Sequence, residues 1–239
     1  MPTRKLGKLG LAVMLALAAL VPFEAQPAED EVSVYKREVE KGFAAWLQAL
    51  WPDVEALGVS RKSFEANLKG LKLNWSLPQI APPDPAYPDG PALPAALKPK
   101  PRHQAEFDIP ELYFSKGALS SLAATGRGKF KQLGPTLAAI QEQYGVPASI
   151  VVAIWGRETG FGKADLPFDA LSAIATQGFM GRRPDVFRQE VIAALKILQE
   201  GYATRAEMRS SWAGAMGYTQ FLPSDFEKYA VDFDGDGRR

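Results

Sequence analysis

Hydrophobic positions in this chain recur mainly at helical spacing. In residues 31–73 an apolar face repeats every three or four residues and consists of Val39, Phe43, Trp46, Leu47 and Leu50. Pro52 is expected to kink that helix or to start a new one, because proline cannot donate the hydrogen bond of a helix interior. Ser60 is expected to cap a further helix that carries Phe64 and Leu68.

The second half of the chain repeats this pattern. Residues 110–144 return to helical spacing through Leu133, Leu137, Ile140 and Tyr144. Two more helices are predicted at 171–175 and 186–198, the latter with Val191, Leu195 and Leu198 facing inward. No stretch alternates convincingly between apolar and polar residues, as a half-buried strand would, and no repeat is visible. The pattern therefore predicts a mainly α fold.

The stretch from Ser76 to Ala105 interrupts the helices. It holds nine of the chain's 19 prolines, and such a run favours extended polyproline backbone over helix or central strand. We expect a semi-rigid excursion on the surface, with a ligand for a proline-recognising partner as the alternative. This linker at 76–105 separates an N-terminal helical segment at 29–75 from a larger helical domain at 106–239.

Residues 1–28 have the pattern of an export signal. Arg4, Lys5 and Lys8 form a basic start, and residues 9–21 form a 13-residue apolar run that is short for a membrane-spanning helix. Export is therefore predicted, with cleavage after a small residue such as Ala28. An uncleaved membrane tether is the alternative.

Composition narrows the function classes. The 239-residue chain is 46% hydrophobic and 23% charged, as is usual for a globular protein. Its formal net charge of +1 argues against binding to nucleic acid, which usually needs a strong basic excess. The chain has no cysteine, so disulfides, thiol catalysis and cysteine-bound zinc are excluded. The lone histidine, His103, argues against a histidine metal cluster or a Ser-His-Asp triad.

The first candidate for chemistry is Glu158, within VPASIVVAIWGRETGFG at residues 146–162. Pro147 suits the first turn of a helix, whose apolar face is then supplied by Ile150, Val151, Ile154 and Trp155. That face continues onto Glu158, so the carboxyl group is expected on the side that packs. A buried carboxyl group keeps its proton to near-neutral pH, as a general acid requires. A glutamate paired with a cation or turned to solvent is the alternative.

The second candidate is the stretch SSWAGAMGYTQFLPS at residues 210–224. Gly214 and Gly217 permit close backbone approach, and the stretch offers flat or soft apolar side chains at Trp212, Met216, Tyr218 and Phe221. A saccharide groove needs such surfaces together with hydroxyl and amide groups, here those of Ser210, Ser211, Thr219 and Gln220. A tightly packed loop between helices is the alternative.

The strings VAIWGRETGFG, SSWAGAMGYTQFLPSDF and YAVDFDGDG resemble the membrane-bound lytic murein transglycosylase B family, over residues 43–239 with gaps. The resemblance implies a lysozyme-like α+β catalytic domain, which in the family continues past the loop that matches the last of these strings. It implies cleavage of the bond between N-acetylmuramic acid and N-acetylglucosamine in peptidoglycan, with a 1,6-anhydro product. Glu158 matches the catalytic glutamate, and Ser211 and Gln220 match groove residues, to which we add Met216 and Tyr218.

The carboxylates near Glu158 bear on the mechanism. Ordinary glycosidases use two carboxylates, and only Asp165 and Asp169 stand near this motif as second ones. A transglycosylase can use one, with Glu158 first protonating the leaving oxygen and then deprotonating the sugar's own C6 hydroxyl. A hydrolytic lysozyme-like enzyme and a non-catalytic peptidoglycan-binding module or inactive fragment are the alternatives.

The last motif runs from Asp232 to Arg238 and fits the first half of an EF-hand loop. Asp232, Asp234 and Asp236 stand at positions one, three and five, and Arg238 offers its backbone carbonyl at position seven. The resemblance also implies a cation site here, for structural Ca²⁺, while a solvated acidic turn is the alternative. The resemblance implies that the chemistry needs no cofactor and that the protein is periplasmic. It also implies peptidoglycan strands and cell-wall synthesis or division proteins as partners.

Overall fold

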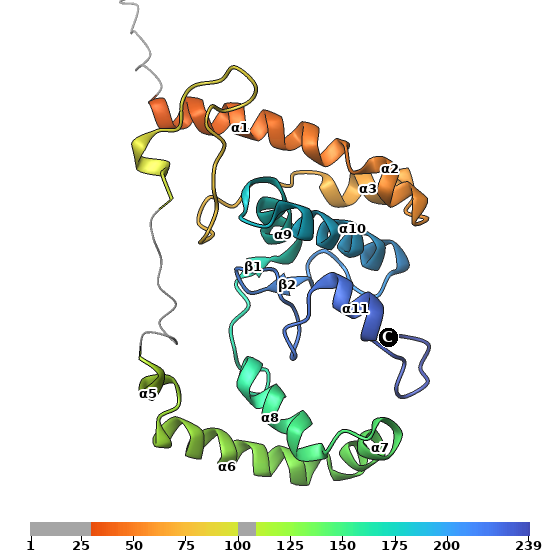
Figure 1. The fold of residues 1–239 in the computed structure, drawn as a ribbon. Helices are drawn as coiled ribbons and strands as arrows, with labels where there is room; N and C mark the ends of the chain where they lie inside the picture. Colours follow the sequence, from red (N-terminus) through yellow and green to blue (C-terminus); the bar gives the residue numbers. More distant parts are fainter. Residues whose placement is uncertain (1–29, 100–108) are drawn as a thin grey trace, which may run out of the picture.

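The structure, a computed structural model, describes residues 30–99 and 109–239 and is mainly helical, as predicted (Figure 1). The predicted signal segment and His103 lie outside the described residues. The described helices are α1 (Glu31–Gln48), α2 (Trp51–Ala56), α3 (Arg61–Leu68), η1 (Ala95–Leu97), α5 (Pro110–Tyr113), α6 (Lys116–Gln132), α7 (Gly134–Tyr144), α8 (Ala148–Thr159), α9 (Ala170–Met180), α10 (Pro184–Glu200) and α11 (Pro223–Tyr229).

A small antiparallel sheet, which the sequence pattern did not predict, joins two distant segments. Its strands are β1 (Phe168–Asp169) and β2 (Arg209–Ser210), with Phe168 opposite Ser210. Strands of two residues are too short to show any alternation of apolar and polar side chains. The Ala170 N–H group extends the pairing by donating to the Met208 carbonyl at 2.9 Å, so the start of α9 lies beside the segment that precedes β2.

The N-terminal helices form as their sequence predicts. The α1 helix buries Tyr35, Val39, Phe43 and Leu47 on one face. Pro52 lies in the first turn of α2, where its missing N–H group is not needed. Ser60 caps α3, its side chain accepting a hydrogen bond from the backbone N–H group of Ser63.

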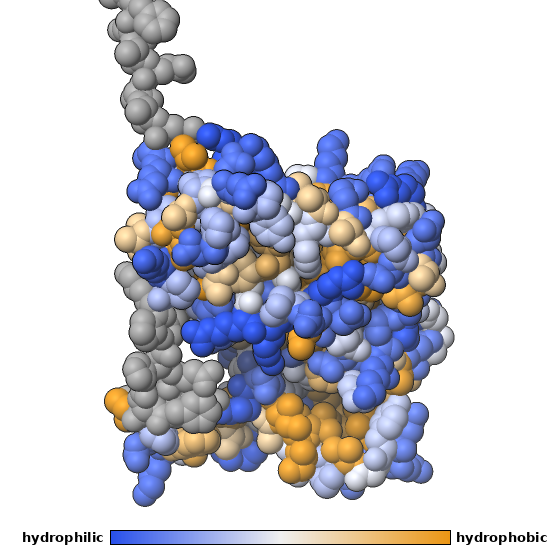
Figure 2. Space-filling view, turned by 45° about the horizontal axis from the view of Figure 1, so that its top comes forward, coloured by the Kyte–Doolittle hydropathy of each residue, from blue (hydrophilic) through white to orange (hydrophobic). Residues whose placement is uncertain are grey.

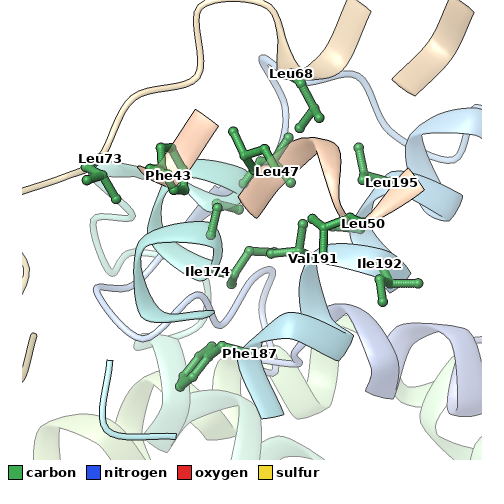
Figure 3. Packing of buried hydrophobic residues seen from close by; sticks show 14 of the residues in the cluster. Phe43, Leu47, Leu50, Leu68, Leu73, Ile174, Phe187, Val191, Ile192 and Leu195 are labelled. Carbon is green, nitrogen blue, oxygen red and sulfur yellow. The ribbon is translucent and has the colours of Figure 1, made fainter. Parts of the chain in front are cut away.

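These N-terminal helices share one hydrophobic core with α9 and α10 (Figures 1 and 3). Phe43, Leu47 and Leu50 come from the N-terminal side, and Ile174, Val191 and Leu195 meet them from α9 and α10. The α9 helix is buried on nearly all sides, because it lies between the N-terminal layer and the rest of the fold. This core contains residues from both sides of the Pro-rich linker. The predicted domain boundaries stay a prediction.

The described part of the Pro-rich excursion, residues 76–99, packs on α1 and on the end of α9. Burial raises the pKa of Tyr35 to about 12, with the charge of Asp84 adding to the effect, and the Tyr35 hydroxyl donates to the carbonyl of Pro83. The Ala81 N–H group donates to the Met180 carbonyl at 2.6 Å. The Tyr87 ring stacks on Phe179 with the ring centroids 6.1 Å apart. The excursion is thus held to the surface by specific contacts.

The helices α6, α7 and α8 form a second layer around a smaller cluster of Leu137, Ala148, Val152 and Phe161. Residues 110–144 contain three helices instead of one run, and the Gly134-Pro135 pair begins α7. Tyr144, predicted on the apolar face, is exposed at the helix end. No single described helix is long and apolar enough to cross a membrane. The helices α7 and α8, which are bent by 111° relative to each other, reach that length and apolar composition only when they are taken together.

The short helix α11 is tied to α10 by a buried carboxylate. The Glu190 side chain accepts hydrogen bonds from the Ser224 backbone N–H group at 2.8 Å and from the Ser224 hydroxyl at 2.7 Å. The first N–H groups of a helix have no hydrogen-bond partner within the helix, and the Glu190 carboxylate accepts one of them. This contact fixes the end of the loop that precedes α11.

Candidate functional site

Glu158 is the penultimate residue of α8, and its side chain is exposed. Ile150 and Ile154, which precede it on the same helical stripe, are each 49% exposed. The prediction that the carboxyl group is buried is therefore wrong, and of the predicted apolar face only Val151 and Trp155 pack, half-buried against the smaller cluster. The buried side of α8 consists of Ala148, Val152, Gly156 and Thr159.

Small residues decide which side of α8 packs. The ring of Phe161 folds back onto Gly156, where an added Cβ would lie only 2.5 Å from the ring atom Cζ. Phe161 reaches this position with a φ of 64°, directly after Gly160, the left-handed residue that ends the helix. The close contact can form only on the glycine side, so Glu158 projects from the other side.

The neighbour of Glu158, Thr159, connects α8 to the second candidate stretch. Its hydroxyl donates a hydrogen bond to the Tyr218 carbonyl at 2.8 Å and accepts one from the Gly162 N–H group at 3.1 Å. The rings of Trp155 and Tyr218 lie with centroids 5.6 Å apart. The two motifs that the sequence singled out separately are therefore in direct contact.

The loop between β2 and α11 is closed by backbone hydrogen bonds. The Met216 N–H group donates to the Phe221 carbonyl at 2.8 Å, and the Phe221 N–H group donates back to the Met216 carbonyl at 3.0 Å. At its base Gly214, with a φ of 82°, lies against Ile174 of the main core. The loop is thus anchored at one end to the core and at its tip to α8.

The four predicted saccharide-binding residues all lie on this loop. Tyr218 is 64% exposed, and its ring lies at the end of α8. Met216 is half-buried against the core, and the half-buried Ser211 bonds through its N–H group to the Ala215 carbonyl. Gln220 has a φ of 55°, and its side-chain amide donates to the Gly217 carbonyl at 3.0 Å. Tyr218 is the residue of this set that the structure brings to the α8 end.

The two candidate second carboxylates differ in their surroundings. Asp169 caps α9 by accepting the Ser172 N–H group at 2.9 Å, and the Arg205 guanidinium lies 2.9 Å from its other oxygen. Asp165 is exposed on the segment between α8 and β1. Asp169 therefore serves the fold, and Asp165 is the one left available to solvent.

Exposed apolar side chains precede Glu158 on α8. Figure 2 shows hydrophobic side chains gathered in the lower part of the molecule, where the α6–α8 layer lies in Figure 1. Ile150 and Ile154 of α8 are exposed large hydrophobic residues, and so is Tyr218 on the loop that contacts the α8 end. A separate apolar cavity of about 560 Å³ opens between α6 and α8, and its lining includes Ser149, Ala153 and Phe161 but not Glu158.

The acidic turn at the C-terminal end brings three carboxylates together. Oxygen atoms of Asp232, Asp234 and Asp236 lie within 4.8 Å of one another. The Asp232 carboxylate accepts the N–H groups of Gly235 at 2.8 Å and Gly237 at 2.9 Å, which holds the turn in shape. Gly237, at position six of the predicted loop, has the positive φ of 86° that the sharp turn requires.

Most of the chain matches a known protein family. The family model described as transglycosylase SLT domain matches residues 42–239. Membrane-bound lytic murein transglycosylase B of Escherichia coli (strain K12) is 42% identical over 95 residues, which are 39% of this chain and 26% of that protein.

Solved structures show the same similarity. SltB3 from Pseudomonas aeruginosa, in complex with NAG-NAM-pentapeptide, is 30% identical with a TM-score of 0.63, covering 82% of this chain and 47% of that one. The soluble lytic transglycosylase SltB1 from Pseudomonas aeruginosa is 29% identical with a TM-score of 0.61, covering 82% of this chain and 59% of that one. The chain thus spans about half the length of these structures, and their lysozyme-like fold agrees with the one expected. It belongs to the transglycosylase SLT domain family.

Proposed function

We propose that this chain is a lytic transglycosylase of peptidoglycan, with Glu158 as its general acid and base. The observation that carries this proposal is the contact between the α8 end and the loop of Tyr218, which brings an exposed aromatic ring to the helix end that carries the exposed carboxyl group. Two solved structures of one relative support the substrate class, because SltB3 was crystallised with NAG-NAM-pentapeptide and with NAG-anhNAM-pentapeptide.

The reaction needs one carboxyl group in two protonation states. Glu158 donates its proton to the glycosidic oxygen as the bond from that oxygen to C1 of the muramic acid breaks. The resulting carboxylate then accepts the proton of the C6 hydroxyl on the same sugar. The C6 oxygen bonds to C1 and closes the 1,6-anhydro ring, so that no water is consumed and the carboxyl group is regenerated.

The surroundings of Glu158 suit this one-carboxylate reaction. A retaining hydrolase needs a second carboxylate about 5–5.5 Å from the acid, and an inverting hydrolase needs one at about 6.5–9.5 Å. Asp169 is engaged by Ser172 and Arg205 and cannot also serve as that partner without losing the cap of α9. The exposed Tyr218 ring offers a face on which the apolar side of a sugar ring can stack.

The products of a digest test this proposal. Purified peptidoglycan incubated with the full chain is expected to release muropeptides with the mass of the anhydro form, which is one water lighter than the hydrolysed form. Mass spectrometry distinguishes the two. Products that carry the added water would show a hydrolase, and binding of NAG-NAM-pentapeptide without any product would show a non-catalytic module.

The acidic turn is proposed to hold a structural cation such as Ca²⁺. Its hard carboxylate oxygens are close enough to bind one ion, and the Arg238 carbonyl follows at the position that an EF-hand loop uses. The predicted partial EF-hand loop thus fits a cation, which on this proposal stabilises the turn and takes no part in bond cleavage.

Titration calorimetry with CaCl₂ on the chelator-treated protein tests the cation site. We expect a dissociation constant on the order of 10⁻⁴–10⁻³ M, as in weak oxygen-ligand sites, and Asp234→Asn should weaken binding further. Arg238→Ala is the matched control, because only its backbone carbonyl is proposed to bind. No heat above dilution, or equal binding by Asp234→Asn, would show a solvated acidic turn instead.

Location and partners follow from the same proposal. A peptidoglycan-cleaving enzyme acts in the cell envelope, so the predicted export signal at residues 1–28 is proposed to deliver this chain to the periplasm, where an uncleaved signal would act as a membrane tether. Peptidoglycan strands are the proposed partner.

A further inference from the structure

Thr159 is a buried polar residue directly after the proposed acid. Its side chain is 2% exposed, and its hydroxyl hydrogen can reach two carbonyl oxygens. The Tyr218 oxygen at 2.8 Å is much closer than the Trp155 oxygen at 3.4 Å, so the bond across the two segments is the stronger one. The residues joined by that bond are 59 positions apart in the sequence.

The same hydroxyl also shapes the turn after α8. It accepts the Gly162 N–H group at 3.1 Å, and Gly162 has a φ of 82°. The Tyr218 ring covers Gly162 so closely that a Cβ there would lie 2.5 Å from the ring atom Cε1. One hydroxyl group thus fixes both the backbone of Tyr218 and the bare glycine surface on which its ring lies.

We propose that Thr159 is a positioning residue, which holds the Tyr218 ring at the end of α8 that carries Glu158 and thereby sets the affinity of the site for the sugar. This role rests on the proposed function, in which Tyr218 contacts the saccharide. Thr159 itself does not touch substrate, because its side chain is covered. Its effect on binding must therefore pass through Tyr218.

Two substitutions separate the hydroxyl group from the volume of the side chain. Thr159→Val keeps the shape but leaves the Gly162 N–H group and the Tyr218 carbonyl without this partner. Thr159→Ser keeps the hydroxyl group and loses only a methyl group. In a Glu158→Gln background, which prevents turnover, we expect Thr159→Val to weaken NAG-NAM-pentapeptide binding about 5- to 10-fold and Thr159→Ser to stay within about twofold.

A double-mutant cycle with Tyr218→Ala decides whether Thr159 acts through the ring. Tyr218→Ala alone is expected to weaken binding, and adding Thr159→Val to it should then have little further effect, because no ring is left to position. A loss of the same size in both backgrounds would overturn the proposal and show a general loosening of the fold. So would unchanged binding by Thr159→Val.

Hydrogen exchange provides a readout that does not depend on activity. The backbone amides of residues 214–222 are expected to exchange faster in Thr159→Val than in the parent or in Thr159→Ser, while those of α9 and α10 stay unchanged. Equal exchange in this loop would overturn the proposal. A parent chain that neither binds nor cleaves glycan would overturn the proposed function itself, whereas a parent that binds and a Thr159→Val variant that binds equally well would overturn only the role of Thr159.

Discussion

Glu158→Gln is expected to lower the rate of anhydro-muropeptide release by at least about 100-fold, since general acid–base catalysis contributes about 10²- to 10⁴-fold. Glutamine has nearly the shape of glutamate but can neither donate the proton to the leaving oxygen nor remove it from the C6 hydroxyl. Because Glu158 is exposed on α8, the substitution should not change the free energy of unfolding appreciably. Mass spectrometry of timed peptidoglycan digests measures the release.

Asp165→Asn is the matched control for this experiment. Asp165 is an exposed carboxylate only seven positions away, and the one-carboxylate reaction gives it no part. Its substitution should leave product formation unchanged, and Glu158→Gln should still bind NAG-NAM-pentapeptide. A Glu158→Gln variant that releases anhydro products at the parent rate, or an Asp165→Asn variant that loses them, would contradict the proposed mechanism.

Local signals in the sequence predict the helices and their ends well. Ser60 and Pro52 act at the starts of α3 and α2 as expected, because caps and proline effects depend on a few neighbouring residues. The inward face of α1 follows from spacing alone, since polar residues occupy its other side. The expected lysozyme-like, mainly helical fold is confirmed by the solved relatives.

The orientation of α8 could not be predicted in this way. Its residues from Ile150 to Trp155 are apolar on several sides, so periodicity offers more than one stripe that could pack. The fold of the turn after the helix decides between them, because Phe161 returns onto Gly156 and fixes that side as the inner one. Glu158 was identified correctly as an end-of-helix carboxyl group and placed on the wrong side.

The sequence pattern also does not predict contacts between segments that are far apart in the chain. The hydrogen bond of Thr159 joins two motifs that the resemblance had named separately, and no local rule connects them. The β1–β2 pair and the core shared by α1 and α10 are also contacts between distant segments that no local rule predicts. The signal that could have pointed to Thr159 is its chemistry, because a polar side chain on the buried stripe of a helix needs a partner.

The anchor of the saccharide loop can be tested at Gly214. In Gly214→Ala the new Cβ would lie 2.1 Å from Cγ2 of Ile174, which is fully buried in the main core. The residue would also keep a φ of 82°, which costs a side chain about 1–2 kcal/mol. Overpacking adds about 1–3 kcal/mol, so we expect a loss of about 3 kcal/mol in the free energy of unfolding, measured by denaturant titration.

Gly217→Ala separates strain from overlap within the same loop. Gly217 has a similar φ of 68°, but a Cβ there would meet nothing within 4 Å. This variant should lose only the cost of the left-handed backbone, about 1–2 kcal/mol, and the difference between the two measures the contact with the core. Equal losses would mean that the loop does not rest on Ile174. A larger loss in Gly214→Ala, together with weaker NAG-NAM-pentapeptide binding, would show that the main core positions the proposed saccharide-binding loop against α8.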